Sequence, residues 1–299
     1  MKDAGALAGE AGKALVIERL RTYASFVRVG HTVFALPFAL VGALLAARAE
    51  PLTPWRVWWI LVAMVTARSA AMGFNRLVDA RFDALNPRTT MRELPQGRMS
   101  RAEATWFVGV ASVGFVVSAW QLGPICFALS PVALAIVFWY SLAKRFTWST
   151  QFFLGLAMAV APVGGWLAAG GGLGWEPVWL AVAIGAWVGG FDVLYACQDL
   201  DFDRTHGLRS IPVRFGVPTA LAISRGLHVV TVGSLFALGH LAGLGAIYHV
   251  GVAAVALLLA YEQSLVRADD LSKVKQAFDL NGYVGVLYLL TTGVALYVG

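Results

Sequence analysis

Apolar residues follow one another in long blocks along this chain, and short polar segments separate the blocks. Each block runs for about 20 residues, the length that a helix needs to cross the roughly 30 Å hydrocarbon core of a bilayer. We predict nine membrane-spanning helices from these blocks. They cover residues 29–48, 55–78, 104–122, 124–142, 150–169, 177–197, 218–239, 245–264 and 281–298. The pattern therefore predicts an all-α integral membrane protein.

The composition supports this class and excludes others. Hydrophobic residues make up 59% of the chain and charged residues only 13%, whereas about 25% of an average soluble protein is charged. The net charge of +6 lies in loops, without a basic run interleaved with aromatic residues, so nothing indicates a nucleic acid. Cys126 and Cys197 lie in apolar sequence and lack the spacing of a disulfide framework or a metal site.

Positive charge alternates between the loops, which predicts the orientation of the chain. The N-terminus and the segments 80–103, 144–145, 200–217 and 265–278 carry the basic residues, while the intervening loops are nearly bare. By the positive-inside rule the basic set is cytoplasmic, with the N-terminus inside and the C-terminus outside. We therefore expect a multi-pass protein of the cell inner (plasma) membrane, with the lipid bilayer as its surroundings and no obligate protein partner.

The domain organisation is simple. Residues 1–26 are mixed and charged, without the apolar core and cleavage site of a signal peptide, and predict a cytoplasmic N-terminal segment. Residues 27–299 are predicted to form a single transmembrane domain.

Two rows of polar side chains lie at the cytoplasmic ends of predicted spans. Residues four apart share one face of a helix, so the spacing gives two such rows. They consist of Asn75, Asp79 and Asp83, and of Tyr195, Asp199 and Asp203, with Asp192 further into the span. Ordinary solvated helix ends are the alternative interpretation. Because an ionisable group inside a span costs about 2.5–3.5 kcal/mol on insertion scales, we favour a functional cavity.

The side chains of the rows predict a hard metal ion. Converging carboxylates repel one another and need a compensating cation. Oxygen ligands without nearby His or Cys favour Mg²⁺, which commonly joins one or two carboxylates to substrate phosphates. The predicted metal ligands are Asn75, Asp79, Asp83, Asp199 and Asp203.

Basic residues on the same predicted side of the membrane suit a diphosphate. The candidates for binding it are Arg68, Asn75, Lys144, Arg145 and Arg209. Arg68 is the sharpest of them, since it lies inside an apolar span and a guanidinium matches phosphate oxygens. A role in membrane topology remains the alternative for each basic residue.

The two rows resemble the motifs of the UbiA superfamily of intramembrane prenyltransferases. The first family motif, N-D-x-x-D-x-x-x-D, matches at Asn75, Asp79 and Asp83, and the second, D-x-x-Y-A-x-x-D-x-x-x-D, matches from Asp192 to Asp203. The strings ALNPRT (84–89), YSLAKRFTW (140–148) and HGLRSIPVRFG (206–216) are also similar to this family. Arg76 departs from the motif, where Asp is common, and Asp201 is an additional acid; their roles stay open.

The resemblance implies a fold and an activity. The family fold is a ring of nine transmembrane helices around a central cavity with a cytoplasmic cap. The active site would open to the cytoplasmic side. The implied activity is Mg²⁺-dependent transfer of a prenyl group from a polyprenyl diphosphate to an aromatic acceptor. Asp79, Asp199, Asp192 and Tyr195 are the expected catalytic residues, although Tyr195 could equally be a packed aromatic.

The strings resemble the 4-hydroxybenzoate polyprenyltransferase group most closely. The expected acceptor is therefore a small aromatic acid, 4-hydroxybenzoate first, in quinone biosynthesis. A naphthoate-type acceptor of futalosine-type menaquinone biosynthesis is the alternative, because part of the sequence resembles a bacterial branch some members of which are assigned to that route. A membrane transporter is the alternative from another class. Asn281 and His31 are weaker site candidates.

Overall fold

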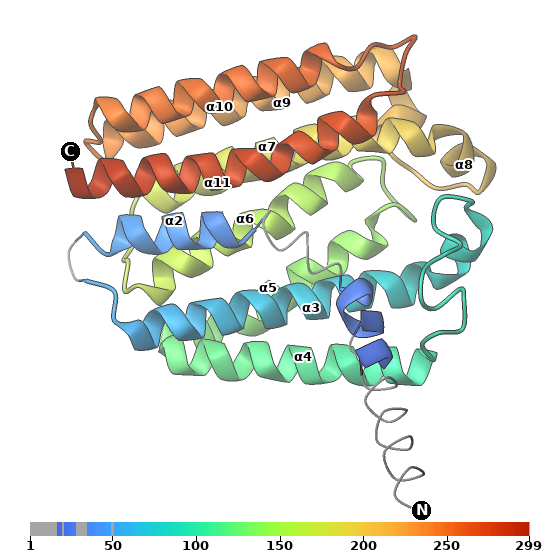
Figure 1. Ribbon diagram of the computed structural model, residues 1–299, viewed down its shortest axis with the longest axis horizontal. Coiled ribbons are helices and arrows are strands. Elements are labelled where there is room, and N and C mark those ends of the chain that lie inside the picture. Colours follow the sequence, from blue (N-terminus) through green and yellow to red (C-terminus); the bar gives the residue numbers. More distant parts are fainter. Residues whose placement is uncertain (1–16, 20, 28–34, 49–50, 299) are drawn as a thin grey trace, which may run out of the picture.

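The computed structural model describes residues 17–19, 21–27, 35–48 and 51–298, and its described residues form an all-helical bundle (Figure 1). The helices are α2 (Leu36–Ala46), α3 (Pro54–Leu85), α4 (Arg101–Leu122), α5 (Pro124–Ala143), α6 (Thr150–Ala168), α7 (Glu176–Ala196), α8 (Leu200–Thr205), α9 (Ile211–Leu241), α10 (Ala246–Ser264) and α11 (Val274–Val298). A short N-terminal helix at residues 21–26 precedes them. The all-α prediction is confirmed.

The long helices agree with the predicted spans. Eight helices in the described residues are long and apolar enough to cross a membrane. Helix α2 has 11 residues and lies within the first predicted span, the beginning of which falls outside the described residues. The total of nine spans and the orientation of the termini therefore stay predictions.

Local sequence signals explain where several helices begin. Helix α3 begins after Thr53, whose side chain accepts a hydrogen bond from the backbone N–H of Arg56. Helix α4 begins with a capping box, in which Ser100 and Glu103 satisfy each other's backbone N–H groups. Helix α9 is kinked at Gly216, which has a φ of 78° that other residues rarely adopt.

Helix α7 is the central helix of the bundle. In the candidate span that contains it, 67% of the apolar window is buried, compared with 44% or less in every other candidate span. Its Trp187 packs against Phe38 of α2, with ring centroids 4.9 Å apart, and both side chains are almost fully buried. Since α7 leads directly into the second acidic row, the core of the bundle fixes the position of that row.

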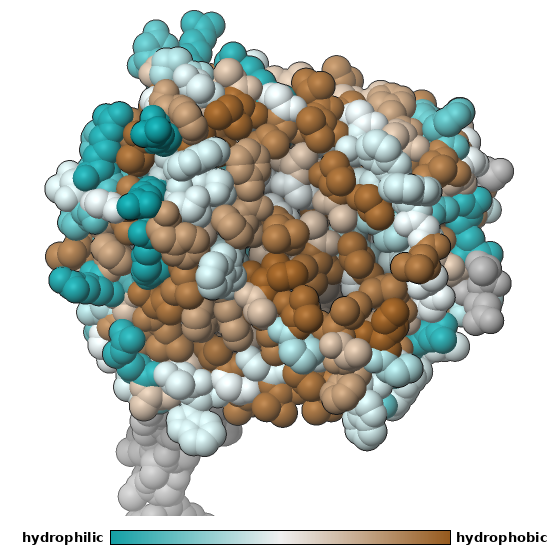
Figure 2. Space-filling model, turned by 180° about the vertical axis from the view of Figure 1, so that it is seen from behind, coloured by the Kyte–Doolittle hydropathy of each residue, from teal (hydrophilic) through white to brown (hydrophobic). Residues whose placement is uncertain are grey.

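The outside of the bundle suits a lipid environment. Helix α4 exposes a stripe of large apolar side chains that includes Trp106, Val110, Val113 and Trp120. Figure 2 shows a broad hydrophobic surface with hydrophilic residues gathered toward its two ends. One end carries the loop between α3 and α4 (residues 86–100, the 86–100 loop) together with α8; we call it the site end (Figure 1).

Candidate active site

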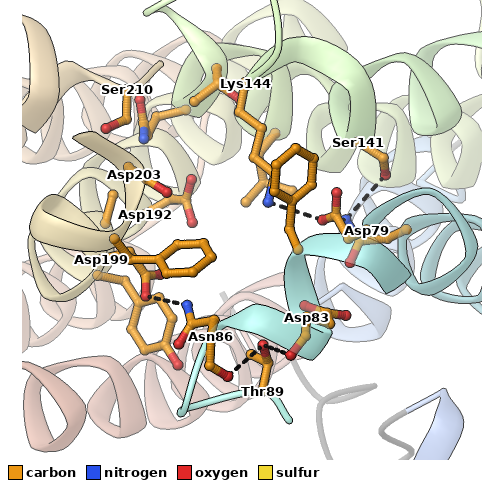
Figure 3. A pocket seen from close by; sticks show the side chains of 18 of the residues that line it. Asp79, Asp83, Asn86, Thr89, Ser141, Lys144, Asp192, Asp199, Asp203 and Ser210 are labelled. Atoms are coloured by element: carbon orange, nitrogen blue, oxygen red, sulfur yellow. Dashed lines mark hydrogen bonds and ion pairs between the residues drawn. The ribbon is translucent and has the colours of Figure 1, made fainter. Parts of the chain in front are cut away.

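A polar cavity of about 240 Å³ lies at the site end of the bundle (Figure 3). Its walls come from α3, the 86–100 loop, helices α5 to α8 and the residues just before α9. The cavity brings together all the predicted site residues except Arg68 and Arg145. Those that line it are Asn75, Asp79, Asp83, Lys144, Asp192, Tyr195, Asp199, Asp203 and Arg209. Side chains that are far apart in sequence thus share one compartment.

Asp79 of the first row is held by two cations. Its carboxylate lies 3.1 Å from the Lys144 ammonium and 2.8 Å from the Arg145 guanidinium, and only 4% of the residue is exposed. Asn75, one turn away on α3, donates at 3.3 Å to the carboxylate oxygen that Lys144 also contacts, and to Ser141 at 3.4 Å. Such partners offset the hydration that a carboxylate loses when it is buried.

Asp83 is paired with the loop that follows its own helix. Nη1 of Arg92 donates to both carboxylate oxygens, at 2.7 and 2.8 Å. The hydroxyl of Thr89 donates to the backbone carbonyl of Asp83 at 3.1 Å. The loop therefore folds back over the end of α3 and supplies the counter-charge of the second carboxylate in the row.

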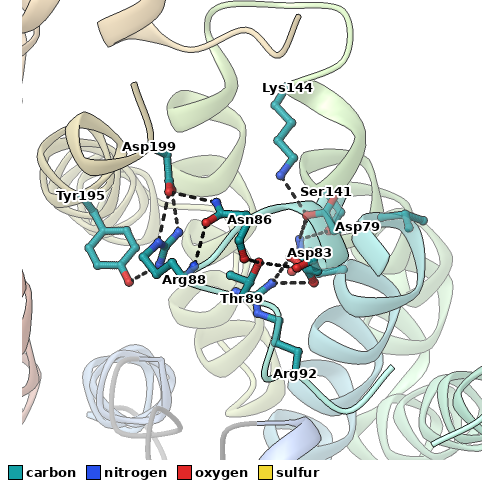
Figure 4. Close-up of polar contacts among 12 residues, drawn as sticks. Asp79, Asp83, Asn86, Arg88, Thr89, Arg92, Ser141, Lys144, Tyr195 and Asp199 are labelled. Atoms are coloured by element: carbon teal, nitrogen blue, oxygen red, sulfur yellow. Dashed lines mark hydrogen bonds and ion pairs between the residues drawn. The ribbon is translucent and has the colours of Figure 1, made fainter. Parts of the chain in front are cut away.

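Asp199 of the second row is also paired with the 86–100 loop (Figure 4). The Arg88 guanidinium donates to both oxygens of Asp199, with Nε 3.1 Å away, and donates to the Tyr195 hydroxyl at 2.7 Å. Asn86 adds a long hydrogen bond to Asp199 at 3.4 Å. Burial alone would lower the pKa of Arg88, but the Asp199 carboxylate raises it overall, so the guanidinium stays charged.

The second row differs from the predicted regular helix. Helix α7 ends at Ala196, a 3₁₀ turn spans Cys197–Asp199, and α8 begins at Leu200. The continuous α-helical row was therefore wrong in this detail, because the chain tightens by part of a turn at Asp199. Tyr195, Asp199 and Asp203 nevertheless all line the cavity.

Arg145 and Arg68 do not line the cavity. Besides Asp79, Arg145 donates to the backbone carbonyls of Ser141 and Val78 at 2.7 and 2.8 Å, so it joins the end of α5 to α3. Arg68 lies deeper on α3, within electrostatic reach of Tyr140, whose side chain does line the cavity. Their predicted binding of a diphosphate stays a prediction.

The structure also locates the residues whose roles were open. Arg76 is buried but does not line the cavity, and Asp201 is exposed outside it. Asn281 lies away from the cavity, where its side-chain oxygen accepts a 2.7 Å hydrogen bond from the indole N–H of Trp187. His31 lies outside the described residues.

The sequence interpretation missed four cavity residues of the 86–100 loop, Asn86, Arg88, Thr89 and Arg92. Asn86, Arg88 and Arg92 hold the carboxylates of both rows, yet none was assigned a role. The signal was the string Asn-Pro-Arg-Thr directly after the first row, on the basic side of the membrane. Which carboxylate each side chain meets depends on how the loop folds, and no local spacing encodes that.

The donor set of the cavity fits a hard divalent cation. Its charged acceptors are carboxylates, and neither His nor Cys is among the lining residues. In the part of the chain that the structure describes, no three acidic, His or Cys side chains are already grouped as a metal site. Mg²⁺ does not require such a group, because it binds through one or two carboxylates and takes further oxygens from water and substrate phosphates.

Known proteins resemble the chain over almost its whole length. The model of the UbiA prenyltransferase family matches residues 35–289. A protein of Vibrio campbellii named 4-hydroxybenzoate octaprenyltransferase is 31% identical over 284 residues, covering 94% of this chain and 99% of that protein. A protein of the same name from Alkalilimnicola ehrlichii is 32% identical over 286 residues, covering 94% of this chain and 97% of that protein.

Solved structures share the fold. A UbiA homolog from Aeropyrum pernix K1, solved in its apo form, is 36% identical with a TM-score of 0.81, covering 89% of this chain and 98% of that chain. A UbiA homolog from Archaeoglobus fulgidus bound to GPP and Mg²⁺ has a TM-score of 0.75 at 19% identity, covering 92% and 99%. The resemblance seen in the two acidic motifs is confirmed, and with it the expectation of an enzyme. This chain belongs to the UbiA prenyltransferase family, and it is a multi-pass membrane enzyme.

Proposed function

We propose that this enzyme transfers a polyprenyl group from a polyprenyl diphosphate to the ring of a small aromatic acid, with 4-hydroxybenzoate as the first candidate. One observation carries the proposal: two acidic rows and their counter-cations converge on one cavity at the polar end of an apolar bundle. The name shared by relatives that are 31–32% identical over nearly the whole chain supports this acceptor.

The donor would be held by charge. When bound, Mg²⁺ would neutralise negative charge on the leaving diphosphate. The predicted ligands Asn75, Asp79, Asp83, Asp199 and Asp203 all line the cavity and would hold it. The ligands of the Archaeoglobus fulgidus homolog, GPP and Mg²⁺, belong to the two chemical classes proposed here.

The cavity cations have a second use in this proposal. Lys144, Arg88 and Arg92 are each paired with a carboxylate of the rows. With the carboxylates occupied by a metal ion, these cations would be available to donate to the diphosphate oxygens of the leaving group. Asp79, Asp83 and Asp199 would then have a cationic partner both with and without the donor.

The reaction breaks the bond between the prenyl carbon and the diphosphate oxygen and forms a carbon–carbon bond to the ring. The diphosphate takes the bonding electron pair, and the ring loses one proton. Asp192, which lies on α7 and lines the cavity, would accept that proton. Phe82, Tyr140 and Leu154 also line the cavity and would limit water near the prenyl cation.

The site end is proposed to face the cytoplasm of the inner membrane. The basic segments of the chain gather on the predicted inner side, including the 86–100 loop and the segment before α9. An anionic donor and an aromatic acid would then both reach the cavity from the cytoplasm.

The alternative acceptor is a naphthoate-type acid of futalosine-type menaquinone biosynthesis. The experiment supplies purified protein with Mg²⁺, a series of polyprenyl diphosphates and either acceptor, and identifies products by mass spectrometry. Prenylated 4-hydroxybenzoate is the expected product. If only the naphthoate-type acid gives a product, that acid and not 4-hydroxybenzoate is the acceptor. If neither acid gives a product, quinone-pathway prenylation is refuted.

A further inference from the structure

The N-terminal helix, residues 21–26, is packed into the site end of the protein (Figure 1). Phe26 is fully buried in a cluster with Met99 of the 86–100 loop and Ala104 of α4. The ring of Phe107 meets two aromatic residues of this helix, Tyr23 at 5.6 Å and Phe26 at 5.7 Å between centroids. Tyr23 and Phe26 thus attach residues 21–26 to the folded core near the cavity.

One hydrogen bond joins this helix directly to the 86–100 loop. The hydroxyl of Ser25 donates to Oε1 of Glu93 at 2.5 Å. Only 3% of Glu93 is exposed, and its second oxygen, Oε2, makes no hydrogen bond in the described part of the chain. A buried carboxylate with so few donors depends strongly on each one it has.

Glu93 is connected to the cavity by the backbone. It directly follows Arg92, whose guanidinium holds both oxygens of Asp83. Its own backbone carbonyl accepts a 2.9 Å hydrogen bond from the N–H of Arg98, which closes the loop on itself. A displacement of Glu93 would therefore move Arg92 away from Asp83, and with it the loop that carries Arg88.

We propose that Ser25 and Glu93 are positioning residues, through which the N-terminal helix holds the 86–100 loop in place over the donor cavity. The inference rests on the proposed function in one respect, that Arg88 and Arg92 serve binding of the diphosphate. Neither positioning residue lines the cavity; they act through the loop.

Arg19, two residues before this helix, offers a matched control. It forms an exposed 3.0 Å ion pair with Glu103 of α4, which attaches this part of the chain to the bundle but not to the 86–100 loop. Exposed pairs of this kind contribute little to stability. Ser25→Ala therefore removes the contact with the loop, whereas Arg19→Ala removes only a contact with α4.

The test measures hydrogen exchange of peptides from residues 86–100 in the full-length protein, together with steady-state kinetics. Ser25→Ala is expected to speed exchange of the loop and to raise KM for the polyprenyl diphosphate by about tenfold, the effect of losing one hydrogen bond to a charged group. We expect kcat to change much less, because the reacting groups are intact. Ser25→Thr, which keeps the hydroxyl, and Arg19→Ala should both behave as the wild type.

The proposal is overturned if loop exchange in Ser25→Ala equals that in Arg19→Ala. Faster exchange in α7 as well as in the loop would also overturn it, since that result shows general loss of structure. Glu93→Gln supplies a second variant: its amide oxygen can still accept from Ser25, so a mobile loop would contradict the proposal. If the wild type turns over neither acceptor, the proposed function fails, while the exchange comparison still decides the role of Ser25.

Discussion

Arg88 and Asp199, which are 111 residues apart in sequence, form a two-oxygen ion pair across the cavity. The pair joins the loop after the first acidic row to the end of the second row. A metal ion held by Asp199, as proposed above, would compete with Arg88 for the two carboxylate oxygens. The same competition would apply to Asp83 and Arg92.

Removing Arg88 should weaken binding of the donor. Arg88→Ala is expected to lower kcat/KM for the polyprenyl diphosphate by about 10- to 100-fold, because a charged hydrogen bond contributes about 1.5–3 kcal/mol. The matched control is Arg81→Ala, an exposed arginine at the same end of the protein that does not line the cavity. Equal kcat/KM values for the two variants would return Arg88 to a structural role.

Asp79 and Asp199 of the acidic rows should be essential for turnover, whereas the neighbouring Asp201 should not be. Asp79→Ala or Asp199→Ala is expected to abolish turnover and leave membrane insertion intact, because each removes a carboxylate proposed to hold the metal. Asp201→Ala is the control, since this exposed acid lies between Asp199 and Asp203 but outside the cavity. Initial rates at saturating Mg²⁺ measure the difference. Wild-type rates from the Asp79 or Asp199 variant would refute the metal role.

Substitutions at the adjacent residues Lys144 and Arg145 should differ in their effects on activity and on thermal stability. Lys144 lines the cavity and pairs with Asp79, so Lys144→Ala should lower activity strongly and change the thermal midpoint little. Arg145 also bonds two backbone carbonyls, and Arg145→Ala should lower the midpoint as well, because those acceptors lose their donor. Thermal unfolding in detergent, measured beside activity, compares the two. A larger loss of stability in the Lys144 variant would contradict this division.

Of the two adjacent glycines Gly164 and Gly165 in α6, only Gly165 should be needed for the close packing of α6 against α2. A Cβ at Gly165 would clash with the backbone oxygen of Ala39, so Gly165→Ala should destabilise the bundle by about 1–3 kcal/mol. A Cβ at the exposed Gly164 has no atom of another segment within 4 Å, so Gly164→Ala is the control. Thermal midpoints of the two variants in the same detergent test the prediction. An equal midpoint for both would show that α2 can shift without cost.

The sequence alone was sufficient to place the long helices and to identify the polar residues at the site end. Blocks of about 20 apolar residues predict spans, because a helix of that length crosses the bilayer and satisfies its own backbone hydrogen bonds. The four-residue spacing from Asn75 to Asp83 likewise predicted a row, which α3 carries without interruption. These features are local, so a local pattern encodes them.

Only the tertiary structure decided which charges meet. The 86–100 loop has no regular period, and its path over the cavity depends on packing against α3, α4 and the N-terminal helix. That path selects Arg88 for Asp199 and Arg92 for Asp83, and it makes Ser25 a neighbour of Glu93. The physical reason is that a residue's spacing along a helix is fixed by the backbone, whereas the partner of a loop side chain depends on the whole fold around it.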